Sequence, residues 1–193
     1  MGADNDMSRK NDKRDRLIDA ADELIYQQTF NSTTLADIAS KADVPLGNVY
    51  YYFKTKDDIL KAVVQKRGAT LQAQFSEWEQ KFSDPRERLH AFIDSNVMIS
   101  ETTAQFGCAM GSLAQELGKG TGELANLAAE LMNKTLAWIE SQFKAIGKGE
   151  QSSVMAKHLM GSLQGGQLLT LTFKDPNVLL RQSKNLEKWL ETA

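Results

Sequence analysis

Cysteine, histidine and proline are scarce in this 193-residue chain, and these low counts restrict disulfides, metal sites and breaks in helices. The single cysteine, Cys108, cannot form a disulfide within the chain and suits a reducing compartment. The two histidines, His90 and His158, lie far apart, and no His/Cys/Glu cluster has metal-ligand spacing. We therefore expect no metal site and no cofactor, and nothing in the chain resembles catalytic machinery. Few prolines and few β-branched runs predict an almost wholly helical protein.

Long apolar runs are also missing. No stretch approaches the roughly 18 residues of a membrane span. Residues 1–13 are polar and charged and lack the apolar region of a signal peptide. We expect a cytoplasmic protein with no membrane partner. The formal net charge of −2 does not exclude DNA as a partner, because DNA binding needs cations on one face rather than a basic chain.

The three prolines mark places where helices should begin. Pro45, Pro85 and Pro176 each precede a periodic segment and interrupt none. Asp84 and Asp175 stand directly before two of them, which places a capping carboxylate ahead of a first-turn proline.

Residues 33–53 have the pattern of two short helices with a tight joint. Leu35 and Ile38 share one helical face, and Thr34 with Asp37 nearly forms a capping box. The break before Pro45 ends the first helix, because the residue before a proline is disfavoured in the helical region.

The second short helix divides by face. Val49 and Phe53, four residues apart, are core candidates. The other side carries Asn48, Tyr51 and Tyr52. Helices this short are marginal alone, so neighbours must hold them. The pair matches a helix-turn-helix, whose second helix enters the major groove; a helical hairpin inside a larger bundle is the alternative.

The run from Val49 to Leu60, VYYYFKTKDDIL, resembles the recognition helix and following turn of the TetR family of bacterial repressors. The spacing from the amphipathic helix at residues 13–25 to the tyrosine-rich run is also similar to that family. The likeness covers about the first third of the chain, and Pro45 departs from it, because many members have Ser or Thr there. It implies an all-α fold: an N-terminal three-helix helix-turn-helix head plus a larger helical ligand-binding and dimerisation domain, about nine helices in total.

The expected helices follow from apolar periodicity and from helix stop signals. They are residues 11–28, 34–41, 46–52, 56–82, 85–102, 110–118, 122–146, 151–173 and 176–191. We expect a disordered arm at 1–10, a DNA-binding domain at 11–66 and a ligand-binding and dimerisation domain at 67–193. The resemblance implies a homodimer through the last two helices, where Gly161, Gly165 and Gly166 would allow close packing; completion of the monomer core is the alternative.

The predicted partner is double-stranded operator DNA. The candidate DNA-binding residues are Lys13, Thr33, Thr34, Pro45, Leu46, Gly47, Asn48, Tyr50, Tyr51, Tyr52, Lys54 and Lys56. Leu46 and Asn48 are placed for base edges, and Gly47 permits close backbone approach. Tyr51 and Tyr52 suit phosphates or sugars, whereas Tyr50 fits a packing role. The basic residues of the arm, Arg9, Lys10, Arg14 and Arg16, have two interpretations: phosphate contacts or a solvated tail.

The C-terminal part is expected to bind an unknown small-molecule effector in a mostly apolar pocket. The candidate ligand-binding residues are Trp78, Phe92, Asn96, Phe106, Cys108, Met110, Gln115, Trp138, Met160 and Gln164. Plain core packing is the alternative for each. The Gly-Cys turn at Cys108 is similar to one subgroup of TetR-like repressors, some of which respond to electrophiles. A thiol at a helix N-terminus is more reactive; the role of a small buried apolar residue, which cysteine often has, is the alternative.

Together these patterns predict a ligand-responsive repressor that binds a palindromic operator as a dimer and is released by a small apolar or electrophilic effector. Two alternatives remain from the sequence. One is an activator of the same fold, and the other is a helical small-molecule carrier that does not bind DNA.

Overall fold

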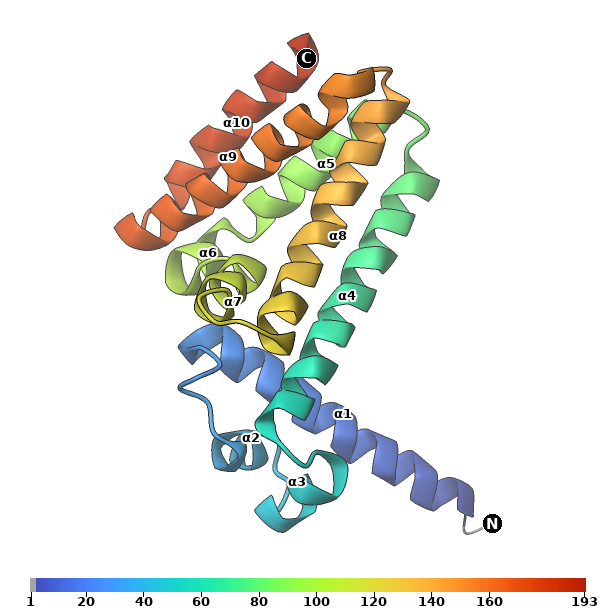
Figure 1. Cartoon of the computed structure of the whole chain (residues 1–193), viewed down its shortest axis with the longest axis vertical. Helices are drawn as coiled ribbons and strands as arrows, with labels where there is room; N and C mark the ends of the chain where they lie inside the picture. Colours follow the sequence, from blue (N-terminus) through green and yellow to red (C-terminus); the bar gives the residue numbers. More distant parts are fainter. Residues whose placement is uncertain (1–2) are drawn as a thin grey trace. The chain divides into compact units, whose positions relative to one another are not determined.

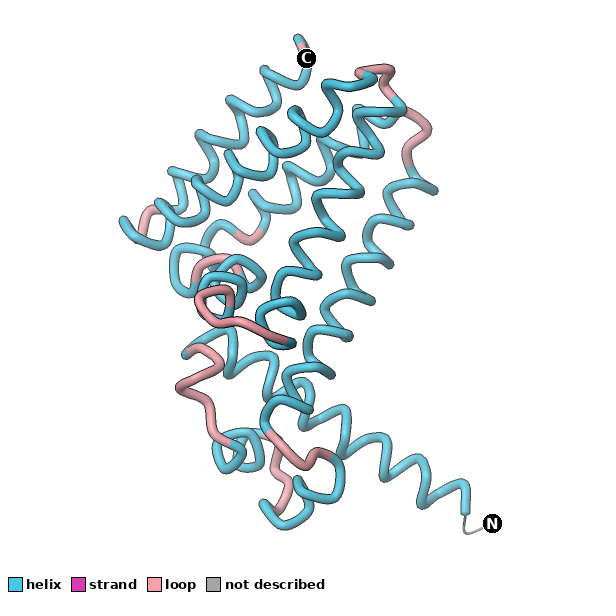
Figure 2. Tube along the Cα trace, in the orientation of Figure 1, coloured by secondary structure: helices cyan, strands magenta, loops and turns pink. Residues whose placement is uncertain are grey.

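The computed structural model describes the backbone of residues 3–193 and the side chains of residues 12–193. The chain divides into two compact units. The first contains Met1–Arg67 and Leu113–Ala128, and the second contains Gly68–Ser112 and Ala129–Ala193. Figure 1 labels the helices along the chain, and Figure 2 shows that residues 3–193 form helices and short loops without strands.

The helices confirm the predicted all-α fold. They are α1 (Ala3–Gln28), α2 (Leu35–Lys41), α3 (Leu46–Tyr52), α4 (Lys56–Lys81), α5 (Pro85–Met98), α6 (Ser100–Phe106), α7 (Ala109–Leu117), α8 (Glu123–Ala145), α9 (Ser152–Phe173) and α10 (Pro176–Thr192), with a 3₁₀ turn at Gly149–Gln151. The predicted caps are also present, because the Asp84 carboxylate accepts from the amide of Arg86 and the Asp175 carboxylate from that of Asn177. Each capped helix begins at a proline, Pro85 or Pro176.

Two predicted elements differ from the structure. The arm expected at 1–10 is helical from Ala3 onward, because no glycine or proline interrupts α1; residues 1 and 2, like the side chains of Arg9 and Lys10, lie outside the described residues. The helix expected at 85–102 is two helices that meet at Ile99, whose φ of −102° and ψ of 11° are not helical. The bend gives α6 a buried side of its own at Ser100, Thr103 and Ala104.

The boundary between the units differs from the predicted domains in one respect. The division within α4 falls between Arg67 and Gly68, beside the predicted limit at residue 66. Residues 113–128, expected in the ligand-binding domain, group with the N-terminal unit instead. Their side chains bond to that unit: Glu116 contacts the segment between α1 and α2, and Glu123 pairs with Lys61 of α4 at 2.8 Å.

Four helices bury the core of the first unit. Its fully buried side chains include Leu17 of α1, Ile38 of α2, Val49 of α3 and Ile59 of α4. Contributions from α2 and α3 are small, because each helix has seven residues. Their positions therefore depend on what holds them against α1 and α4.

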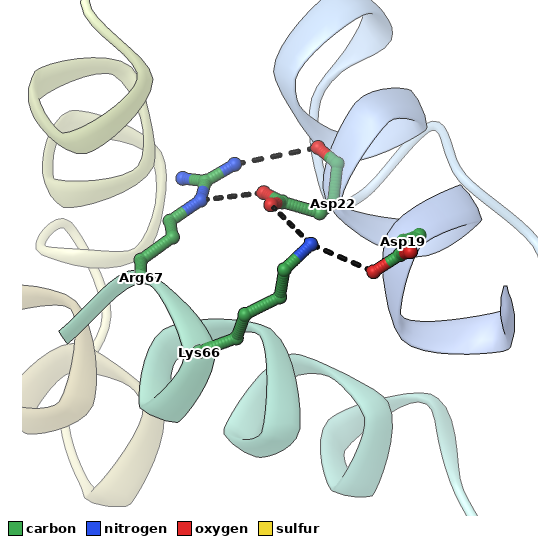
Figure 3. Close-up of polar contacts among 4 residues, drawn as sticks. All are labelled: Asp19, Asp22, Lys66 and Arg67. Carbon is green, nitrogen blue, oxygen red and sulfur yellow. Dashed lines mark hydrogen bonds and ion pairs between the residues drawn. The ribbon is translucent and has the colours of Figure 1, made fainter. Parts of the chain in front are cut away.

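A cluster of charged side chains joins α1 to α4 in this unit (Figure 3). The Arg67 Nε donates to an oxygen of Asp22 at 2.7 Å, and Lys66 Nζ lies 2.7 Å from Asp19 and 3.7 Å from Asp22. Asp19, followed by Asp22, raises the pKa of Lys66. Arg67 is largely buried, with 10% of its side chain exposed, so its guanidinium depends on this pairing.

The second unit has a core built around stacked aromatic rings. Phe75 of α4 stacks on Trp138 of α8 with ring centroids 4.4 Å apart and an interplanar angle of 7°. Trp78 and Phe92 pack edge-on beside this pair, at 6.3 Å. Leucines of α9 and α10 complete the core, and Trp189 of α10 packs against Phe143.

None of the helices among the described residues is long and apolar enough to cross a membrane. No group of three or more His, Cys, Asp or Glu side chains among them could hold a metal ion.

Candidate nucleic-acid interface

Helix α2 begins with the capping box that the sequence suggested. The Thr34 hydroxyl accepts from the Asp37 amide at 3.1 Å, and Asp37 accepts from the Thr34 amide at 2.9 Å and from its hydroxyl at 2.6 Å. The hydroxyl and then the amide of Thr34 lower the pKa of the Asp37 carboxyl. The Thr34 hydroxyl is thus committed to the start of α2, although its side chain is exposed.

Helix α2 ends in a Schellman motif centred on Asp43. Asp43 has a φ of 51°, and the Val44 amide reaches back to the Ala39 carbonyl at 2.9 Å. Glycine usually occupies this position, but aspartate tolerates it. Arg16 of α1 holds the turn, because its guanidinium donates to the carbonyls of Ala42 and Asp43 and lies 3.3 Å from the Asp43 carboxylate. This turn sets the angle between α2 and α3.

Helix α3 presents one face outward and buries the other. Val49 is fully buried and Phe53 is 4% exposed, as predicted. On the opposite side, Leu46 is 43% and Tyr51 is 59% exposed, and Asn48 is exposed as well. Apolar and aromatic side chains this exposed in such a short helix are unusual in a closed core.

Gly47 lies on the same outward face. A Cβ atom built at this glycine meets no other atom within 4 Å, so the fold does not require a glycine there. Pro45 before it is exposed and stands at the N-cap of α3 without a side-chain capping bond.

Three of the predicted DNA-binding residues are placed differently from expectation. Thr33 is fully buried, and its hydroxyl donates to the Thr29 carbonyl at 2.7 Å, so it closes the loop between α1 and α2. Tyr50, for which a packing role was expected, is 49% exposed. Its position follows from geometry, because only Val49 and Phe53 of this segment face inward.

Lys56 is the third residue placed differently. Its ammonium lies 2.9 Å from the Phe30 carbonyl and 3.0 Å from the Thr33 carbonyl, and 4.3 Å from the centroid of the Phe30 ring. It therefore binds the loop between α1 and α2, and its charge is used inside the unit.

The other basic and aromatic candidates lie nearer the outward face. Lys54 is exposed and donates to the Tyr50 carbonyl at 2.8 Å. Tyr52 is half-buried and packs edge-on against Tyr51, with centroids 5.1 Å apart. Lys13 is half-buried on α1. Next to it, Arg14 places its guanidinium 5.4 Å from the centroid of the Phe53 ring.

The predicted ligand-binding residues fall into separate groups. Trp78, Phe92, Trp138 and Met160 belong to the aromatic core of the second unit, where the Trp138 indole N–H donates to Glu79 at 2.9 Å. Gln115 is exposed and belongs to the first unit, so it does not join this group.

A second group surrounds the thiol of Cys108. The Gly111 amide donates to Sγ at 3.3 Å, and the Gln164 amide nitrogen lies 3.5 Å from Sγ. Gly107 has a φ of 81°, which explains the glycine before the cysteine. Cys108, Phe106 and Met110 are all half-buried.

A polar pair in the same unit joins Asn96, a predicted ligand-binding residue, to Gln167, which the sequence analysis did not identify. Asn96 accepts from the Gln167 side chain at 2.8 Å and donates to the Phe92 carbonyl at 2.8 Å. Gln167 is only 3% exposed, and its Oε1 has no hydrogen-bond partner among the described residues. In the sequence, the one signal for Gln167 is its helical spacing from the apolar residues of α9, which places it on the buried side of that helix.

The sequence of this chain is similar to those of known regulatory proteins. The profile described as "Bacterial regulatory proteins, tetR family" matches residues 17–63, which run from α1 through α3 into α4. The HTH-type transcriptional regulator LmrA of Bacillus subtilis is 25% identical over 181 residues, covering 89% of this chain and 93% of that protein.

Solved structures share the fold. A TetR transcriptional regulator from Legionella pneumophila has a TM-score of 0.81 at 21% identity, covering 90% of this chain and 94% of that one. FadR from Bacillus subtilis, solved in complex with stearoyl-CoA, has a TM-score of 0.72 at 18% identity, covering 91% and 96%.

A capped positioning helix, a clamped turn and an outward-facing second helix define a helix-turn-helix, and the protein is a DNA-binding transcriptional regulator rather than an enzyme. The profile match over residues 17–63 and the similarity along the chain support membership of the TetR family of bacterial transcriptional regulators.

The two lysines that flank Thr55 should differ in their effect on stability. Replacing Lys56 with glutamine removes a cation that binds the part-buried carbonyls of Phe30 and Thr33, and we expect the free energy of unfolding to fall by about 2 kcal/mol. Replacing Lys54 with glutamine removes an exposed bond to the Tyr50 carbonyl, and the free energy of unfolding should change by less than about 0.5 kcal/mol. Urea unfolding followed by circular dichroism measures both. Equal losses in the two variants would contradict the internal role of Lys56.

Proposed function

We propose that this protein is a ligand-responsive repressor that binds a palindromic operator as a dimer. The observation that carries the proposal is α3, a helix buried on the Val49 side and exposed at Leu46, Asn48 and Tyr51. The resemblance to the TetR family of repressors supports repression rather than activation. A regulator of DNA would act in the cytoplasm, where bacterial DNA lies.

Side chains of α3 would divide the recognition. Asn48 can donate to and accept from a base edge, and Leu46 offers apolar contact with a thymine methyl group. Tyr51 and Tyr52 suit phosphates or sugars, and the Lys54 ammonium suits a phosphate. Arg14 and Lys13 of α1 would add cations beside them.

The proposed DNA binding is tested by selecting fragments that the purified protein retains from a random pool. Affinity for the selected sequence is then measured by gel shift at several salt concentrations. A contact set with several phosphates predicts a steep linear loss, about 0.9 in the logarithm of affinity per phosphate for each logarithmic step of salt. Selection of no common sequence would favour the helical carrier.

Gly47→Ala is the variant that separates DNA contact from folding. No atom of the protein lies within 4 Å of the added methyl group, and alanine favours a helix over glycine by up to about 1 kcal/mol. We expect equal or higher thermal stability together with operator affinity at least about 10-fold weaker, because the methyl group would meet the DNA. Unchanged affinity would show that the α3 backbone does not approach the groove.

We further propose that dimerisation uses α9 and α10. One side of α9 is exposed and apolar or small: Val154 is 69%, Leu168 50% and Phe173 64% exposed. Gly161 and Gly165 lie on the same side, and a Cβ at either meets nothing within 4 Å. Mid-helix glycines that no packing within the chain requires are explained by close approach of a second copy.

Dimerisation also follows from the demands of operator binding. The seven residues of α3 span only about 10 Å and reach few base pairs. A two-fold dimer presents two such helices about 34 Å apart on successive major grooves.

Gly161→Leu should convert the dimer to a monomer without unfolding the chain. A Cβ at this position meets nothing within 4 Å in the single chain, so helical content should stay unchanged, while the leucine would block close approach of a second α9. Sedimentation equilibrium at micromolar concentration measures the mass. The control is Lys188→Leu on the charged outer side of α10, which is expected to remain dimeric. A dimeric Gly161→Leu protein would place the interface elsewhere.

The effector is proposed to bind in the second unit. The buried aromatic side chains of Trp78, Phe92 and Trp138 would provide an apolar lining, and the unpartnered Gln167 Oε1 would provide a polar anchor. FadR, a structural neighbour, binds a ligand with a long acyl chain, which supports an apolar effector. We propose that residues 67–193 form the effector and dimer domain, with 113–128 reaching the DNA-binding head at 11–66.

An electrophilic effector would instead react with Cys108. The Cys108 Sγ, which the Gly111 and Gln164 N–H groups contact, would be the nucleophile. Since Cys108 is the one cysteine, N-ethylmaleimide modifies a single thiol. We expect the alkylated protein to bind operator at least about 10-fold more weakly and Cys108→Ala to be insensitive to the reagent. Full affinity after complete alkylation would leave only the apolar effector.

A further inference from the structure

The loop between α1 and α2 is held from two sides by opposite charges. The Glu116 carboxylate accepts from the Phe30 amide at 3.0 Å and from the Asn31 amide at 2.7 Å. On the acceptor side, the Lys56 ammonium binds the carbonyls of Phe30 and Thr33. Two backbone donors of the loop are therefore used by one charged residue and two of its acceptors by another.

The partner on the donor side comes from a distant part of the sequence. Glu116 stands in α7, 85 residues beyond Asn31, yet both belong to the first compact unit. Two hydrogen bonds from consecutive amides to one carboxylate are charge-assisted and strong. Thr29 has a φ of 80°, which turns the chain at the end of α1 immediately before these two amides.

The loop leads directly into the helix-turn-helix. Its last residue, Thr33, is followed by Thr34, the N-cap of α2. Helix α2 has too few residues to fix its own orientation, so the position of its first turn depends on the loop. A change at Phe30 and Asn31 is therefore transmitted to the start of α2.

We propose that Glu116 is a positioning residue for DNA binding, which acts by fixing the loop between α1 and α2. This inference rests on the proposed function, because it assigns a role within operator binding. Glu116 does not contact the DNA. It fixes the position of α2 and, through the turn at Asp43 that Arg16 holds, the position of α3 for entry into the major groove.

Electrostatics alone predicts the opposite sign for the loss of this residue. Removing a negative charge from a unit that binds polyanionic DNA should strengthen binding. The positioning role predicts that removing the Glu116 charge weakens it. The direction of the change in affinity therefore separates the two explanations.

The experiment compares Glu116→Gln with Glu123→Gln in the full-length protein. Both remove one carboxylate from the first unit, but Glu123 pairs with the Lys61 side chain rather than with backbone amides, and its side chain is 74% exposed. For Glu116→Gln we expect operator affinity about 10-fold weaker, with an unchanged salt slope because no phosphate contact is lost. For Glu123→Gln we expect unchanged or slightly tighter binding. Circular dichroism and sedimentation confirm the fold and the mass of each variant.

Hydrogen exchange of the Phe30 and Asn31 amides reports the contact itself. In Glu116→Gln their exchange should accelerate, and in the wild-type protein operator DNA should slow it. Glu116→Asp keeps the charge one methylene shorter, and its affinity should fall between those of the wild type and the glutamine variant. This aspartate variant also tests the proposal if the glutamine variant does not fold.

Each contrary result overturns a distinct claim. Wild-type affinity in Glu116→Gln, or equal weakening in both glutamine variants, would refute the positioning role while operator binding stands. Weaker binding with unaltered amide exchange would refute the route through the loop. If the wild-type protein itself retains no DNA sequence, it is the proposed function that fails.

Discussion

Two seven-residue helices cannot hold their own orientation, and this constraint shapes the whole N-terminal unit. Charged side chains from outside the two helices bond to the backbone at the places where the chain changes direction. Arg16 binds the turn between α2 and α3, and Lys56 with Glu116 binds the loop before α2. The carbonyl and amide groups at these corners have no helical partners, so a charged side chain satisfies them and restrains the corner at the same time.

The cations of this unit therefore serve two purposes. Arg16, Lys56 and Arg67 are used inside the fold, where they bind carbonyls or carboxylates of neighbouring segments. Lys54 and Arg14 are exposed; Lys54 donates to the Tyr50 carbonyl just before it, and Arg14 lies over the Phe53 ring, so both are better placed to meet phosphates. The number of lysines and arginines near the helix-turn-helix therefore overstates the number that could contact DNA. Likewise, the net charge of −2 for the whole chain says little about the charge of this one face.

Local patterns in the sequence predicted the local structure well. The capping box at Thr34, the inward Val49 and Phe53, and the proline starts all depend on residues within one or two helical turns. Contacts between distant segments could not be predicted this way: neither periodicity nor capping rules relate Glu116 to Phe30 or Lys56 to Thr33. The buried position of Thr33 and the exposure of Tyr50 follow from the same limit, because the loop and the turn, not helix propensity, decide which side faces inward.

Aromatic residues are distributed between the two units in a way that has a spectroscopic consequence. All four tyrosines of the chain, Tyr26, Tyr50, Tyr51 and Tyr52, belong to the first unit, and all three tryptophans, Trp78, Trp138 and Trp189, belong to the second. Indole emission excited at long wavelength thus reports the second unit alone. Resonance energy transfer from phenol to indole must cross from one unit to the other. The unlabelled protein therefore carries a donor and acceptor set with which a movement of the first unit relative to the second can be followed in solution.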